Sequence, residues 1–132
     1  MTEKIEWEKL QMEPCSYRVS GIPGLDEDEL HGDVVTIEYR GSGRWGVYHG
    51  RANVLYKGTG LFMLEGLPSS RTEKILEATR FDSPEAALQF LYDSLNNPIK
   101  IRGKALLQQI TGKPQGEGNR YISITAALES KS

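Results

Sequence analysis

Short β-prone runs broken by glycine fill the middle of the chain and restrict its possible folds most strongly. The runs DVVTIEYR, RWGVYHG, RANVLYKG and GLFMLEGL follow one another closely, with glycines at or near their ends. Parallel strands need crossovers of about a dozen residues or more, and no connection of that length fits between these runs. The sequence therefore predicts an antiparallel meander of strands. SYRVSGI, which precedes them, predicts one more short strand.

The clearest helix signal lies in FDSPEAALQFLYDSLNNP. Ser83 is suited to cap the helix amides, and Pro84 suits the first helical position. The apolar residues recur at spacings of three and four and form one stripe, made by Ala87, Phe90, Leu91 and Leu95. We expect one main helix over residues 84–95, packed on the sheet, and a shorter second helix in KALLQQITG that ends at Gly112.

Three further segments have weaker signals. Residues 72–81 fit either a strand or a short helix, and their composition favours a strand. IKIRG predicts a short strand. RYISITAALE alternates apolar residues with period two, which predicts a final strand. Together these elements predict an α+β fold with one domain over residues 1–132, dominated by one antiparallel sheet.

The composition excludes several classes of protein. A hydrophobic content of 38% is too high for disorder to be expected. No run approaches the roughly 18 apolar residues of a membrane span, and the start, MTEKIEWEKL, is charged throughout. We therefore expect a cytoplasmic protein without a membrane partner.

Gly41, Gly43 and Gly46 have the G-x-G-x-x-G spacing of phosphate-binding loops. In a dinucleotide fold a helix must follow these glycines, but VYHGRANVLY has the composition of a strand. The segment therefore predicts a hairpin turn, and no cofactor is expected. The single cysteine, Cys15, and the isolated His31 and His49 give no metal-ligand pattern, so no metal is expected.

Residues 39–64 contain no acidic residue, although the whole chain has a net charge of −2. Within this stretch, cations and aromatic side chains are mixed in a predicted basic hairpin from Arg40 to Lys57, with Arg44 expected at its tip and Trp45 or Tyr48 as an anchor. The predicted binding residues are Arg40, Arg44, Trp45, Tyr48 and Arg51, with Arg71 of PSSR joining them if the adjacent turns meet, and Tyr56 and Lys57 close by. Such a surface suits an acidic protein partner, or nucleic acid through phosphates and stacked bases. In the simplest alternative, Trp45 and Tyr56 face the core and the arginines are solvated.

The run from Trp45 to Leu88, which contains glycine-punctuated strands, PSSR and TRFDSPEAA, resembles small uncharacterised proteins encoded by bacteriophages. The resemblance covers about a third of the chain and assigns no functional residue. It implies expression inside a bacterial host, where small phage proteins often bind host machinery or defence complexes.

These observations predict a non-enzymatic binding protein whose partner is a macromolecule, and a protein rather than nucleic acid. Nucleic-acid binding through the basic hairpin is the first alternative, and an enzyme with a scattered, unrecognised site is the second. If the hairpin is ordinary surface, the acidic segment from Asp26 to Asp33 is the next candidate.

Overall fold

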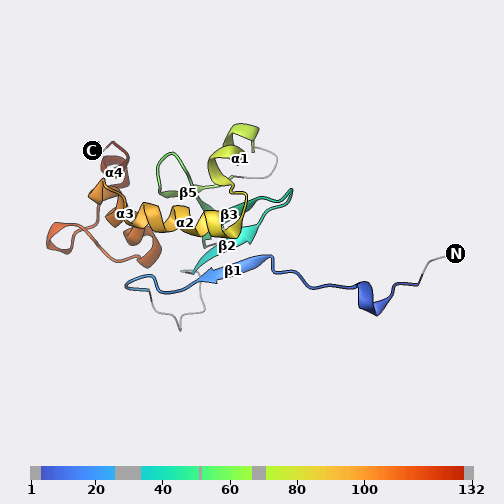
Figure 1. The fold of residues 1–132 in the computed structure, drawn as a ribbon. Coiled ribbons are helices and arrows are strands. Elements are labelled where there is room, and N and C mark those ends of the chain that lie inside the picture. The colour runs from blue at the N-terminus through green and yellow to red at the C-terminus, as the bar shows by residue number, and fades with distance from the viewer. Residues whose placement is uncertain (1–3, 26–33, 51, 67–70, 130–132) are drawn as a thin grey trace.

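Five short strands lie side by side in the order in which they occur in the sequence (Figure 1). The structure, a computed structural model, describes residues 4–25, 34–50, 52–66 and 71–129. The strands are β1 (Ser16–Val19), β2 (Val35–Tyr39), β3 (Trp45–His49), β4 (Asn53–Leu55) and β5 (Phe62–Leu64). Each strand pairs antiparallel with the next, which confirms the predicted meander and the α+β fold.

One face of the sheet carries the main core. Residues directly opposite on neighbouring strands share a face, and Tyr17, Ile37 and Val47 are opposite one another across β1, β2 and β3. Val35, Ile37 and Val47 are buried there, and helix α2 packs against β2 and β3. Burial of these side chains holds helix and sheet together.

The other face has a smaller buried region. Tyr48 and Val54 are opposite each other on β3 and β4, and both are buried outside the main core cluster. Arg80 follows helix α1 (Glu73–Thr79), and its guanidinium carbon lies 6.0 Å from the centre of the Tyr48 ring. The end of α1 therefore covers this face, and it places a charged side chain over it.

The main helix, α2 (Pro84–Leu95), has the predicted bounds. The Ser83 hydroxyl accepts a hydrogen bond from the amide of Ala86 at 3.0 Å, and Pro84 occupies the first turn, as predicted. Ala87 and Leu91 are buried, and the other members of the predicted stripe pack against the same core. The second helix, α3 (Lys100–Thr111), ends at Gly112, whose φ of 68° gives the left-handed C-cap.

The strand predicted over residues 72–81 is wrong, because this segment forms α1. The Thr72 hydroxyl accepts a hydrogen bond from the amide of Ile75 at 3.3 Å, so Thr72 is the N-cap. Glu73 stands in the first turn, where the helix dipole favours an acid. The N-cap signal was therefore more informative than the β-prone composition.

The short strand predicted for IKIRG is also wrong, because α3 already begins at Lys100. Gly103, which weakens a helix prediction, lies inside α3 at a point where the end of α2 passes close to it. A Cβ atom at this position would lie 2.7 Å from the carbonyl oxygen of Leu95. This glycine permits close packing between two helices and does not end one.

The predicted final strand is wrong as well, because residues Ile124–Glu129 form helix α4. The amide of Ala126 donates to the Ser123 hydroxyl at 3.4 Å, and the amide of Ala127 donates to the Ser123 carbonyl at 3.0 Å. Ala127 is buried against the core. Of the period-two apolar pattern, only Ile122 precedes the helix, and its other members lie within α4.

Candidate functional site

The glycine segment forms the turn between β2 and β3, and a strand follows it instead of a helix. Gly41, Ser42 and Gly43 all have positive φ, and the amide of Arg40 donates to the carbonyl of Arg44 at 2.8 Å. The predicted hairpin is confirmed, and glycine suits two of its three turn positions because positive φ is strained in other residues.

Gly46, the third glycine of the segment, serves a different purpose. It lies in β3, where a Cβ atom would come within 2.8 Å of Cε2 of Tyr48 and 3.3 Å of a guanidinium nitrogen of Arg80. Gly46 therefore leaves room for the ring and the guanidinium to pack over the strand. The spacing that resembles a phosphate loop arises from a turn and a packing requirement together.

One buried carboxylate organises the surroundings of Tyr48. Glu65, with 5% of its side chain exposed, accepts hydrogen bonds through Oε1 from the Tyr48 hydroxyl at 2.8 Å and from Arg80 at 2.5 Å. Its Oε2 lies 3.4 Å from a nitrogen of Arg71 and 3.9 Å from a nitrogen of Arg40. We call Arg40, Arg71 and Arg80, gathered around Glu65 and Tyr48, the arginine cluster.

The pKa values of Glu65 and Tyr48 are both shifted by their surroundings. Burial alone would raise the pKa of Glu65, but hydrogen bonds from Arg80 and Tyr48 and the charges of Arg80 and Arg71 outweigh it and lower this pKa. Burial and the hydrogen bond to Glu65 raise the pKa of the Tyr48 hydroxyl. At neutral pH Glu65 is therefore charged, and Tyr48 is a neutral hydrogen-bond donor.

A pocket of about 200 Å³ opens beside the cluster. We call it the arginine pocket, and its lining includes Arg40, Ser42, Arg44, Glu73, Leu76 and Arg80. Both terminal nitrogens of Arg44 donate to Oε1 of Glu73 at 3.3 Å. The side chains of Arg44 and Glu73 are 38% and 64% exposed, so solvent screens this pair.

The predicted anchors lie on opposite faces of the sheet. Trp45 is partly buried, and its ring centre lies 5.8 Å from that of Tyr17 and 5.3 Å from that of Tyr39, forming an aromatic patch of these three residues. Tyr17 and Tyr39 are partly exposed. Tyr48 is buried against Glu65, so its ring is not a surface anchor, whereas Trp45 contributes to an accessible patch.

The remaining predicted residues are spread out. Lys57 is exposed, and its ammonium nitrogen lies 4.7 Å from the centre of the Phe81 ring, while Tyr56 is partly buried. Arg71 joins the cluster, and it also donates to the carbonyl of Gly66 at 3.4 Å. Arg51 and the segment Asp26–Asp33 lie outside the described residues, as does His31.

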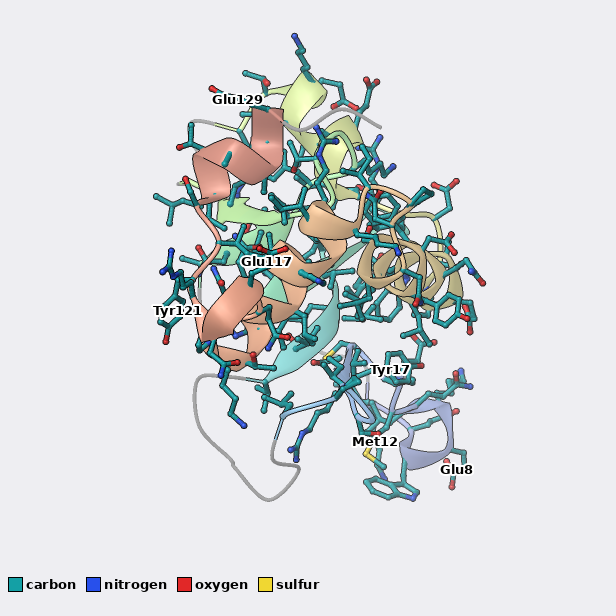
Figure 2. All side chains as sticks on the ribbon, turned by 90° about the vertical axis from the view of Figure 1, so that its left-hand side faces the viewer. Glu8, Met12, Tyr17, Glu117, Tyr121 and Glu129 are labelled. Atoms are coloured by element: carbon teal, nitrogen blue, oxygen red, sulfur yellow. The ribbon has the colours of Figure 1, made fainter. Side chains whose placement is uncertain are left out.

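Residues 4–14 form an arm that runs away from the rest of the protein (Figure 1). Its residues are all exposed, and they include four large apolar side chains: Ile5, Trp7, Leu10 and Met12. Trp7 is 81% exposed and begins a short 3₁₀ helix, Trp7–Lys9. In the view of Figure 2, the labelled Glu8 and Met12 also lie away from the helical layer. The arm leads directly into β1, which carries Tyr17 of the aromatic patch.

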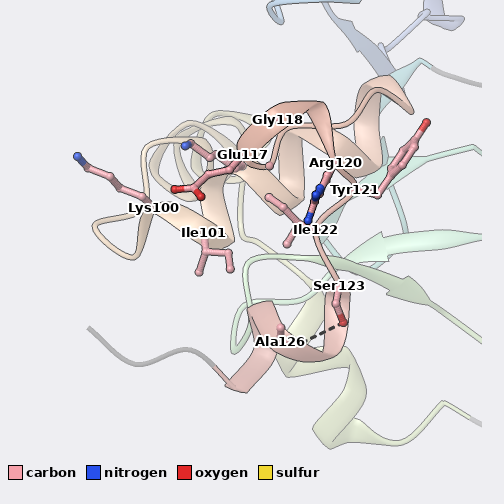
Figure 3. A pocket seen from close by; sticks show the side chains of 11 residues that line it. Lys100, Ile101, Glu117, Gly118, Arg120, Tyr121, Ile122, Ser123 and Ala126 are labelled. Atoms are coloured by element: carbon pink, nitrogen blue, oxygen red, sulfur yellow. Dashed lines mark hydrogen bonds between the residues drawn. The ribbon is translucent and has the colours of Figure 1, made fainter.

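A larger cavity, of about 740 Å³, lies between α3, α4 and the segment that joins them (Figure 3). Ile101 and Ile122 supply apolar lining, and Lys100, Glu117 and Arg120 supply charge. In Figure 3 the ammonium end of Lys100 points away from both isoleucines. The cavity has the size of a small-molecule site, but these charged groups do not converge on one point in it.

In the described parts of the chain, no group of three or more His, Cys, Asp or Glu side chains is placed to hold a metal ion. None of the helices in those parts is long and apolar enough to cross a membrane.

Sequence reasoning missed Glu65, Glu73 and Arg80, as well as the arm. Glu65 is the first acid after the acid-free stretch, and it stands among apolar residues, which is a signal of a buried, paired carboxylate. Glu73 and Arg80 were concealed by the strand prediction for their segment. In the arm, Trp7 among charged residues was the available signal.

The comparisons with known proteins leave the site to be interpreted from its own geometry. No protein-family model matches the chain, and neither the curated proteins nor the solved structures contain a significant match. The resemblance of residues 45–88 to phage-encoded proteins stays a prediction.

Proposed function

We propose that the chain is a non-enzymatic binding protein that acts on another protein, and that its arm makes the principal contact. The supporting observation is the exposure of the four apolar side chains Ile5, Trp7, Leu10 and Met12 within one short segment. Exposed apolar groups gathered in this way are typical of interaction sites. Trp is also among the residues most enriched at the energetic centres of protein interfaces.

The aromatic patch extends this surface onto the folded body. Tyr17 follows the arm within β1, and the rings of Tyr39 and Trp45 continue from it across the sheet. A partner that contacts the arm therefore meets Tyr17 and then Trp45, in keeping with the anchor role predicted for Trp45. Aromatic rings that already pack on one another, as in this patch, lose little side-chain freedom on binding.

The phage resemblance directs the search for the partner to bacterial cells, where host machinery and defence complexes are the proposed targets and the cytoplasm is the proposed location. Nucleic-acid binding is the second candidate, favoured by the excess positive charge around Glu65. A series of salt concentrations separates the two, because phosphate contacts give a steep, nearly linear log–log loss of affinity.

The test begins with a nuclease-treated pull-down and continues with affinity measurements on the purified partner. We expect Trp7→Ala to weaken binding by about 30-fold, the effect of a hot-spot residue, and Trp45→Ala to weaken it less. Glu8→Ala, an exposed substitution on the same arm, is the matched control. Equal affinities for Trp7→Ala, Glu8→Ala and the parent protein would exclude the arm as the principal contact.

A further inference from the structure

We propose that the arginine pocket binds a single phosphoryl group as the dianion of a phosphate monoester or of inorganic phosphate. The inference is independent of the arm and of the protein partner proposed above. It depends on the charge of the pocket, on its size and on the carboxylate of Glu73, which pairs with Arg44 there.

The charge of the cluster is unbalanced. Three guanidinium groups, from Arg40, Arg71 and Arg80, surround the one carboxylate of Glu65, which leaves an excess of two positive charges. The buried Nε of Arg71 also has no hydrogen-bond partner among the described residues, but Arg71 does not line the pocket. A doubly charged anion in the pocket supplies the missing negative charge, and its oxygens accept hydrogen bonds from the arginines that line it.

The cationic side chains are held in place before any ligand arrives. Arg80 is 4% exposed and is fixed by Glu65 and by the Thr79 hydroxyl, to which it donates at 3.1 Å. Arg40 lies with its guanidinium carbon 5.0 Å from the centre of the Tyr48 ring. Preorganised cations of this kind lose little side-chain freedom on binding.

The mouth of the pocket already holds a carboxylate. Glu73 accepts a hydrogen bond from each terminal nitrogen of Arg44. Both nitrogen–oxygen distances are 3.3 Å, which is longer than the 2.7–2.9 Å typical of charge-assisted hydrogen bonds. Glu73 lines the same pocket as Arg44, so a phosphoryl group bound there competes with Glu73 for Arg44.

The grouping of the cations favours one phosphoryl group over a nucleic-acid backbone. The pocket volume of about 200 Å³ is sufficient for a phosphate. Three arginines, Arg40, Arg44 and Arg80, line this one pocket. A backbone carries a single charge per phosphate and is usually followed by cations along a groove.

The experiment titrates the whole chain with inorganic phosphate by calorimetry at constant ionic strength. A phosphoserine peptide, its unphosphorylated form and a single-stranded oligonucleotide are titrated in parallel. Tighter binding of the phosphopeptide than of phosphate identifies a phosphorylated side chain as the source, and equal binding identifies the free anion. Binding of the oligonucleotide alone, or of none of these probes, overturns the proposal.

Two substitutions have opposite expected effects. Arg44→Gln removes a charged donor and should weaken phosphate binding about tenfold. Glu73→Gln removes the competing carboxylate and should strengthen it. Lys74→Gln and Glu77→Gln make the same charge changes at exposed positions of α1 outside the pocket lining, and they serve as matched controls. The proposal is overturned if Lys74→Gln weakens phosphate binding as much as Arg44→Gln does and if Glu77→Gln strengthens it as much as Glu73→Gln does. That result would show that diffuse charge, and not the pocket, explains the binding.

Discussion

Replacing Glu65 by Gln tests whether the buried carboxylate holds the second face of the sheet together. The change keeps the shape of the side chain but leaves Arg80, 4% exposed, without its counter-ion. Removing one partner of a buried ion pair costs about 3–5 kcal/mol. The Gln side chain retains one oxygen that can accept a hydrogen bond from Tyr48 or Arg80. Solvent can also stabilise the unpaired charge of Arg40, because 30% of that side chain is exposed. We therefore expect a cost near the lower limit, about 3 kcal/mol.

This cost is a large part of the 5–15 kcal/mol by which a typical domain is stable, so the variant should fold but unfold at lower urea concentration. Urea unfolding followed by circular dichroism measures it, with Glu77→Gln as the exposed control. The pH dependence gives a second measurement. The folded pKa of Glu65 is lowered, so its stabilisation is complete above the unfolded pKa of about 4.3 and is lost as the pH falls through the folded value.

The difference in unfolding free energy between the parent protein and Glu65→Gln should therefore narrow below about pH 4. A difference that stays within about 0.5 kcal/mol of the Glu77→Gln result at neutral pH would refute the reasoning. So would a difference that does not change with pH, because it would show that shape, and not charge, determines the stability of this region.

Two further substitutions test the packing. Gly46→Ala should cost about 1–3 kcal/mol, because its Cβ would overlap the Tyr48 ring at 2.8 Å, and a neutral result in urea unfolding would show that the ring moves freely. Leu91→Ala should cost about 2–5 kcal/mol, because Leu91 is buried in the core. Gln89→Ala, on the exposed face of α2, should change stability by less than about 0.5 kcal/mol, and similar melting temperatures for the two α2 variants would contradict the assigned face.

The elements that the sequence predicted correctly are those whose signals are local. The glycines at the ends of the β-prone runs define the hairpins, and Ser83 and Pro84 define the start of α2. Two of the elements that it missed, α1 and α4, also have local signals, because Thr72 and Ser123 accept hydrogen bonds from amides at the starts of these helices. Gly103 differs from these, because it weakens a helix prediction until the carbonyl oxygen of Leu95 is placed beside it, and no local pattern encodes that approach.

The site was predicted only in part, because its arginines and the acids that pair with them are far apart in the sequence. The arginines were found because they gather in an acid-free stretch, but the acids that pair with them, Glu65 and Glu73, come from β5's end and from α1. Pairing across 25 and 29 residues follows from the tertiary fold. Tyr48 shows the same limit, since alternation along β3 does not reveal that a second layer covers its face.

The sequential order of the strands affects how the chain behaves while it is being synthesised. All five strands are complete at Leu64, but the helices that cover the apolar face, α2 and α3, are complete only at Thr111. At about 5–20 residues per second, the nascent sheet waits roughly 2–10 s for this cover. During that interval Val35, Ile37 and Val47 face solvent or a chaperone. Mutations that delay α2 should therefore reduce the yield of folded protein even where they leave the finished protein almost as stable as before.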